Sequence, residues 1–264
     1  MDQRHFYHFS ALPMSMRMVY TMTLLVLGIG YLFAMLHVHF THSGLDGNPA
    51  SVSAKDIRTA YHGSETDSRL VTALKGSMSG MLPEEERAVI FKWVDDGADP
   101  AAYDTLIRPI MEARCIDCHD GGDPNLPLLT TQEEVMKLVE LDTGKTVQSL
   151  VRVSHIHLFG ITFIFFIVSS IFAHAYMRPL WLKCVIIVVP FLTIITDIFS
   201  WYLTKWVPDF AWFIIASGVL MGISFTIQWV VSMWQMWFYT LPDDIQECGG
   251  ALPTIRRKIN TDDV

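Results

Sequence analysis

Four stretches of this sequence are long and apolar enough to cross a lipid bilayer, and they restrict the chain to a membrane fold. They cover roughly residues 18–40, 154–176, 180–203 and 210–239. A helix needs about 20 predominantly apolar residues to cross the hydrocarbon core. The composition agrees, because 51% of the residues are hydrophobic and only 17% are charged. We therefore predict an all-α fold with a four-helix transmembrane domain.

A long polar segment separates the first apolar stretch from the other three. Residues 41–150 contain 19 acidic and 10 basic side chains, so most of the net charge of −8 lies there. No alternation of apolar and polar residues indicates strands in it. We predict a helical domain at 41–153, inserted between the first transmembrane helix (18–40) and three more (154–240). A lead (1–17) and a tail (241–264) complete the chain.

The basic residues beside the spans predict the orientation, because cytoplasmic loops carry an excess of Lys and Arg. Seven fall on one side if both termini are cytoplasmic: Arg4, Arg17, Arg178, Lys183, Arg256, Arg257 and Lys258. The other side has only Arg152 and Lys205. This predicts a multi-pass protein of a bacterial inner membrane whose inserted domain faces the periplasm. The first span has no small-x-small cleavage signature and is typical of an uncleaved signal anchor.

The inserted domain contains the pentapeptide Cys115-Ile116-Asp117-Cys118-His119. C-x-x-C-H is the attachment signature of a c-type haem, in which both cysteines form thioethers and the histidine coordinates iron. A zinc site or a redox disulfide is the alternative for C-x-x-C alone. Zinc would need two more ligands, and the remaining cysteines, Cys184 and Cys248, lie far away in the sequence. We predict covalent haem c on Cys115 and Cys118, with His119 as iron ligand.

Residues around this motif resemble a bacterial c-type cytochrome domain whose segments are reordered. Residues 78–98, with Trp93 and Gly97-Ala98, are similar to the methionine loop and closing helix of such domains, yet they precede the haem motif. Residues 103–119 are similar to the opening helix. The resemblance covers roughly residues 68–150 and implies a monohaem, membrane-anchored cytochrome. A methionine or histidine commonly completes the iron coordination, and the candidates are Met78, then Met81, with His62 as a further possibility.

Local signals predict three helices in this domain. Ser53 is placed to cap a helix that ends at His62. Pro83 begins a helix over residues 84–95, for which Ile90, Trp93 and Val94 form the buried stripe. Thr130 or Thr131 caps a third helix, over residues 132–141.

Four histidines lie at matched depths at the outer ends of the first two spans: His37 and His39 on one, His155 and His157 on the other. Ionisable residues in membrane spans are costly and are candidates for function. They fit a b-type haem, the sixth ligand of the c-type haem, or a quinol site in which a neutral imidazole accepts a proton. Hydrogen bonding at the level of the lipid headgroups is the alternative without such a function.

The last two spans carry further polar residues. Asp197 lies in the outer third of the third span, where a proton-handling role is one interpretation. Ser217, Ser224, Gln228 and Gln235 form a polar stripe on the fourth span. For this stripe we predict hydrogen bonds between helices rather than a binding site.

These observations predict membrane-bound electron transfer between a membrane donor, quinol or a partner complex, and a soluble periplasmic carrier. The acidic domain favours a basic carrier and argues against nucleic acid as a partner. A non-catalytic haem subunit of a larger membrane oxidoreductase and a di-haem (b plus c) quinol-reactive protein are the alternatives. A haem-based sensor ranks behind them, because no output domain is recognisable at either end of the sequence.

Overall fold

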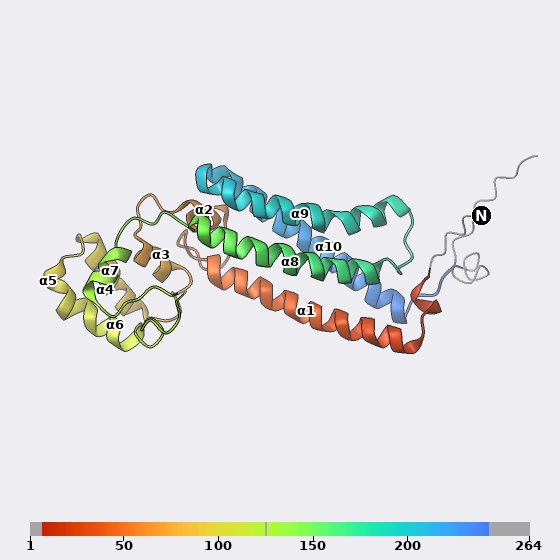
Figure 1. Ribbon diagram of the computed structural model, residues 1–264, viewed down its shortest axis with the longest axis horizontal. Helices are drawn as coiled ribbons and strands as arrows, with labels where there is room; N and C mark the ends of the chain where they lie inside the picture. Colours follow the sequence, from red (N-terminus) through yellow and green to blue (C-terminus); the bar gives the residue numbers. More distant parts are fainter. Residues whose placement is uncertain (1–6, 125, 243–264) are drawn as a thin grey trace, which may run out of the picture. The chain divides into compact units, whose positions relative to one another are not determined.

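The computed structural model describes residues 7–124 and 126–242, and this part of the chain is built from helices (Figure 1). Its β-structure is limited to one isolated bridge between Ser68 and Leu141. The predicted all-α class is therefore confirmed. The chain divides into a bundle unit (Met1–Leu32, Ile156–Ile195 and Ser217–Val264) and a motif unit (Phe33–His155 and Thr196–Ala216).

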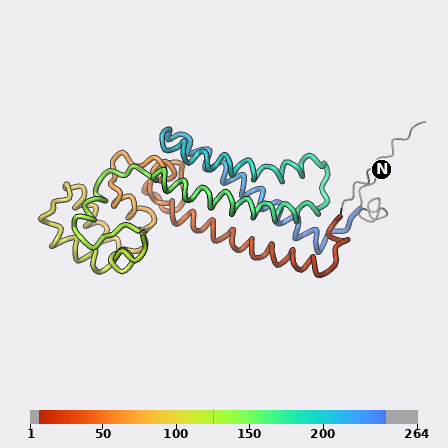
Figure 2. Tube along the Cα trace, viewed as in Figure 1, coloured from red at the N-terminus to blue at the C-terminus, as the bar shows by residue number. Residues whose placement is uncertain are grey.

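Four long helices match the four apolar stretches and appear as the long runs of the trace in Figure 2. They are α1 (Met14–His42), α8 (Val147–Phe172), α9 (Leu180–Trp206) and α10 (Ala211–Trp237). The shortest has 26 residues, or about 39 Å at 1.5 Å per residue, which exceeds a hydrocarbon core of about 30 Å. All four are apolar enough to cross a membrane.

Within the bundle unit, α10 contacts each of the other three long helices. Trp229 Nε1 donates to the Leu24 carbonyl of α1 at 2.7 Å. Ser169 of α8 donates to Gln228 Oε1 at 2.9 Å. Ser224 donates to a carbonyl of α9 at 2.6 Å. Because lipid offers no hydrogen bonds, each of these polar groups is satisfied by another helix.

The polar stripe on α10 compensates for a proline inside α9. Pro190 has no N–H, so the Ile186 carbonyl loses its helical donor. Ser224 Oγ and Gln228 Nε2 both donate to that carbonyl, at 2.6 and 3.0 Å. The Gln228 side chain is fully buried. The prediction of hydrogen bonds between helices is therefore confirmed for Ser224 and Gln228.

The motif unit contains short helices that largely follow the local sequence signals. They are α2 (Ala54–His62), α3 (Arg69–Lys75), α4 (Glu84–Asp95), α5 (Pro100–Ala102), the π-helical η2 (Tyr103–Ile107), α6 (Arg108–Arg114) and α7 (Gln132–Leu138). Ser53 caps α2 in a reciprocal capping box with Asp56. Thr131 rather than Thr130 caps α7, which ends three residues earlier than predicted. The expected span of α4 is confirmed.

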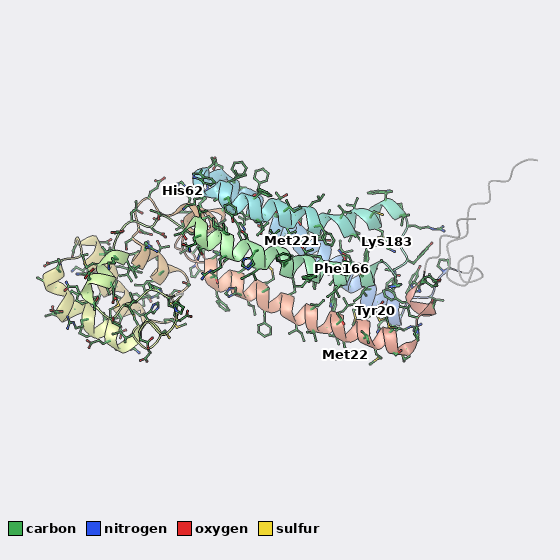
Figure 3. The ribbon with its side chains drawn as sticks, in the orientation of Figure 1. Tyr20, Met22, His62, Phe166, Lys183 and Met221 are labelled. Atoms are coloured by element: carbon green, nitrogen blue, oxygen red, sulfur yellow. The ribbon has the colours of Figure 1, made fainter. Side chains whose placement is uncertain are left out.

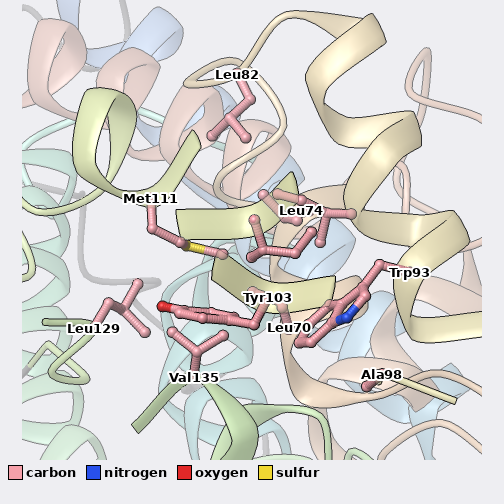
Figure 4. Close-up of a cluster of buried hydrophobic side chains, with 11 residues drawn as sticks. Leu70, Leu74, Leu82, Trp93, Ala98, Tyr103, Met111, Leu129 and Val135 are labelled. Atoms are coloured by element: carbon pink, nitrogen blue, oxygen red, sulfur yellow. The ribbon is translucent and has the colours of Figure 1, made fainter. Parts of the chain in front are cut away.

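These short helices enclose one apolar core, shown in Figure 4. Its buried members are Leu70, Leu74, Leu82, Ile90, Trp93, Ala98, Tyr103, Ile107, Met111, Leu129 and Val135. The predicted burial of Ile90 and Trp93 is confirmed, whereas Val94 is half-buried and packs against this core. The indole N–H of Trp93 donates to the Asp99 carbonyl at 3.0 Å, which ties α4 to the start of α5.

Candidate functional site

The C-x-x-C-H segment forms a helical turn directly after α6. The backbone N–H groups of Cys115 and Ile116 donate to the Met111 carbonyl at 2.9 and 3.1 Å. Those of Cys118 and His119 donate to the Cys115 carbonyl at 3.2 and 3.0 Å. Positions three and four apart share one face of a helical turn. This turn therefore places Cys115, Cys118 and His119 three and four positions apart on consecutive helical hydrogen bonds.

The loop after the motif fixes the protonation of the His119 ring. His119 Nδ1 lies 2.7 Å from the Pro127 carbonyl oxygen. A carbonyl only accepts hydrogen bonds, so Nδ1 carries a proton, and in the neutral imidazole Nε2 then has the lone pair. Metal-binding histidines commonly donate their other N–H in this way, which orients the ring and selects the tautomer. The Leu129 N–H also donates to the His119 carbonyl, at 3.1 Å, and closes the loop.

The two cysteines have different surroundings. Cys115 is half-buried and packs against the core of the motif unit, whereas Cys118 is exposed, and both are free thiols. Burial raises the pKa of the Cys115 thiol, and the Glu86 carboxylate raises it further. The Glu86 carboxylate accepts hydrogen bonds from Nε and Nη2 of Arg114, each at 3.0 Å.

A hollow of about 280 Å³ adjoins the motif, with Ile116, Met111 and Leu129 among its lining residues. Two free thiols separated by two residues and a following imidazole are the donor set that a c-type haem requires. The residues present therefore fit that group. In the part of the chain that the structure describes, no group of three or more His, Cys, Asp or Glu side chains is arranged to hold a metal ion.

The candidates for the sixth ligand differ in burial and in their contacts. Met78 is half-buried and packs against the same core as Cys115, while Met81 is 64% exposed. Both lie in the turns after α3, where the Met81 N–H donates to the Met78 carbonyl at 3.0 Å. His62 donates from Nδ1 to the Lys205 carbonyl at 2.8 Å, so that nitrogen is engaged elsewhere.

The four membrane histidines occupy different environments. His37 and His155 are exposed, and His39 and His157 are partly buried. His39 makes an edge contact with the ring of Phe40. His37, His39 and His155 belong to the motif unit, whereas His157 belongs to the bundle unit.

A ring stack in the motif unit contains residues that sequence reasoning did not bring together. The ring of His42, at the end of α1, stacks on Tyr61 of α2 at 6.3 Å between centroids, and Tyr61 stacks on Trp201 of α9 at 5.8 Å. Trp201 is a hydrogen-bond partner of the buried Asp197. Burial and the Asp197 charge raise the pKa of the Tyr61 hydroxyl. His42 Nδ1 is buried with no hydrogen-bond partner among the described residues.

One of three comparisons with known proteins gave a match, and it covers part of the membrane domain. A family model described as a transmembrane helical domain matches residues 129–243. The comparisons with curated proteins and with solved structures gave no match. The matched residues include α8, α9 and α10. Together with the four apolar helices, this match shows a multi-pass membrane protein.

Proposed function

We propose that this chain is a membrane-bound electron-transfer protein carrying one c-type haem. Cys115 and Cys118 hold the haem through thioethers, and His119 Nε2 coordinates its iron. Electrons pass between a membrane donor, quinol or a partner complex, and a periplasmic carrier across a bacterial inner membrane. The excess of acidic side chains in the inserted domain favours a carrier with a basic surface.

The hydrogen bond from His119 Nδ1 to the Pro127 carbonyl carries this proposal. It orients the imidazole and leaves Nε2 as a ligand, which a merely structural histidine does not require. A haem bound there supplies one-electron transfer. The apolar core behind Cys115 limits the access of water to that side of the site.

Met78 is the proposed sixth ligand, because it is half-buried and packs against the same core as Cys115. The test is to compare Met78→Ala with Met81→Ala in the oxidised, purified protein. Met78→Ala should convert the iron to a high-spin spectrum and lower the reduction potential, whereas Met81→Ala should leave both unchanged. The opposite result assigns the ligand to Met81. If neither variant changes the spectrum or the potential, neither methionine is the sixth ligand.

The haem itself is tested by a pyridine haemochrome spectrum of full-length protein produced together with a c-type maturation system. We expect a c-type spectrum with one haem per chain. Cys115→Ser combined with Cys118→Ser should abolish covalent haem, and Cys184→Ser is the matched control that should retain it. A wild-type protein without covalent haem contradicts the proposal.

A quinol-reactive site is the second candidate function, and the ring stack favours it. The stack holds His42 with a buried Nδ1 that has no partner among the described residues, and it lies beside the buried Asp197. Such groups are suited to accept the protons that a quinol releases. A spectrum with c-type haem and no b-type haem would be compatible with a quinol site. It would exclude a b-type haem bound by the four membrane histidines, His37, His39, His155 and His157. Loss of quinol-dependent haem reduction in His42→Leu, with the haem spectrum intact, would support it.

A further inference from the structure

A cavity in the described part of the bundle unit lies at the connection between α8 and α9. It has a volume of about 600 Å³ and is lined by residues 175–180 and by Lys183, which is labelled in Figure 3. This volume is in the range of small-molecule sites, about 300–1,000 Å³. None of the residues assigned to electron transfer lies in this segment.

Lys183 places a positive charge in the wall of this cavity. Its residue is only 6% exposed. The ammonium group donates to the carbonyls of Ala173 and Ala175, at 2.6 and 2.7 Å. These carbonyls follow the end of α8, where the helix dipole favours a cation. The same contacts hold the charge in a fixed position.

Arg178 supplies a second cation among the residues that line the cavity. Its guanidinium carbon lies 5.6 Å from the centre of the Tyr176 ring, in a cation–π arrangement. Tyr176 is in turn fixed by Gln235 of α10, whose amide accepts from the Tyr176 N–H at 2.6 Å and donates to its carbonyl at 2.7 Å. The Arg178 side chain is exposed, but its guanidinium contacts the ring of Tyr176, whose backbone is held by Gln235.

No acidic residue opposes these charges within the described residues of the bundle unit. Residues 7–32, 156–195 and 217–242 contain no Asp or Glu, while Arg17, Arg178 and Lys183 are present. Arg17, Lys183 and His174 all contribute positive potential at His8, which is buried at this end of the bundle. Among the described residues, the charged side chains near the cavity are therefore positive, which favours an anion.

Apolar residues at and next to the cavity indicate which kind of anion it binds. Leu180 and Trp181 begin α9, a membrane-spanning helix, and are 58% and 65% exposed. Tryptophan is enriched at the level of the lipid headgroups. We propose that the cavity binds an anionic phospholipid, with its phosphate between Lys183 and Arg178 and its acyl chains along the start of α9. Basic pockets between membrane helices are suited to such headgroups.

The experiment is native mass spectrometry of the full-length protein in detergent, titrated with phosphatidylglycerol or with phosphatidylcholine. We expect phosphatidylglycerol to bind the wild type more tightly. Arg178→Gln should weaken that binding about tenfold, as expected for a lost hydrogen bond to a charged group. The matched control, Arg152→Gln, removes an exposed arginine near the other end of α8 and should leave binding unchanged.

A second variant and a competitor make the outcome decisive. Lys183→Met should also weaken binding, but it removes donors from two carbonyls, so its melting temperature is measured in parallel. Equal binding of the two lipids, equal losses in Arg178→Gln and Arg152→Gln, or full displacement by millimolar inorganic phosphate would each overturn the proposal. The readout is lipid mass and does not depend on haem.

Discussion

The bundle unit and the motif unit satisfy their buried polar groups by different means. In the bundle unit, the buried Gln228 is uncharged, and its partners are Ser169, Ser224 and the Ile186 carbonyl on neighbouring helices. In the motif unit, the buried Asp56 is a carboxylate, and it accepts from the backbone N–H groups of Asp46 and Ser53 at 2.8 and 2.7 Å.

The difference follows from what surrounds each unit. A lipid-facing bundle gains nothing from water, so polar groups such as Gln228 pair between helices. The motif unit is rich in charged residues and short loops, and it uses ion pairs such as Lys75 with Asp67, at 2.6 Å. Close backbone contacts between loops replace the long helix–helix interfaces. Substitutions in the backbone contacts of the motif unit and in the interhelical hydrogen bonds of the bundle unit should therefore change the free energy of unfolding by different amounts.

The largest effect is expected at Gly63, where two backbone segments of the motif unit meet. A Cβ atom there would lie 2.2 Å from the Asp142 carbonyl oxygen, at a φ of +107°. Gly63→Ala should cost about 3–5 kcal/mol of unfolding free energy, because the backbone must move. Gly47→Ala is the control: φ is +95° but no atom lies within 4 Å of the added Cβ, so only the strain of about 1 kcal/mol remains.

Hydrogen exchange of the α3 and α4 amides would measure both glycine variants. Equal losses of unfolding free energy in Gly63→Ala and Gly47→Ala would contradict the close contact of Gly63 with the Asp142 backbone. The motif unit would then not depend on backbone contacts in the way that distinguishes it from the bundle unit.

A smaller effect is expected at Gln228 in the bundle unit. Gln228→Leu should cost about 1–2 kcal/mol, the upper range for hydrogen bonds between membrane helices. In a Pro190→Ala background the cost should shrink, because alanine restores an N–H for the Ile186 carbonyl. A double-mutant cycle measured by unfolding in mixed micelles isolates this coupling. Thr226→Val, an exposed position on the same helix, is the control and should stay within about 0.5 kcal/mol.

The smallest effect concerns pH and His8. Burial lowers the pKa of His8 below its ordinary value of 6.5, and the charges of Arg17 and Lys183 lower it further, although the hydrogen bond that His8 donates to Gln235 Oε1 opposes them. Below pH 6.5 the unfolded chain binds a proton that the folded chain does not. Stability should therefore fall as the pH drops below that value. His8→Asn should flatten the pH profile of the melting temperature, and an unchanged profile would contradict the assignment.

Much of the fold could be predicted because it depends on local composition. Apolarity alone located the four long helices, and the capping signal at Ser53 located α2. The predicted hydrogen bonds between helices are confirmed for two members of the polar stripe on α10, Ser224 and Gln228. The chemistry of the motif at Cys115 depends on five adjacent residues and needed no tertiary information to be proposed.

Contacts between distant segments could not be predicted in this way. The bond from His119 to the Pro127 carbonyl depends on the path of an eight-residue loop, which hydrophobic periodicity does not describe. The stack of His42, Tyr61 and Trp201 joins three helices whose sequences carry no shared signal. A backbone carbonyl as a partner leaves no trace in residue identity, so the Ile186 contact was visible only in the structure.

The donors for the Ile186 carbonyl also impose an order on biosynthesis. Ser224 and Gln228 lie more than 30 residues downstream of Ile186, on α10, which leaves the ribosome after α9. Until α10 is synthesised, α9 enters the bilayer with an unpaired carbonyl at Ile186, in a medium that cannot hydrate it. A nascent chain that stops before Ala211 therefore keeps a defect in its third membrane helix. The synthesis of α10 therefore supplies the donors that pair this carbonyl.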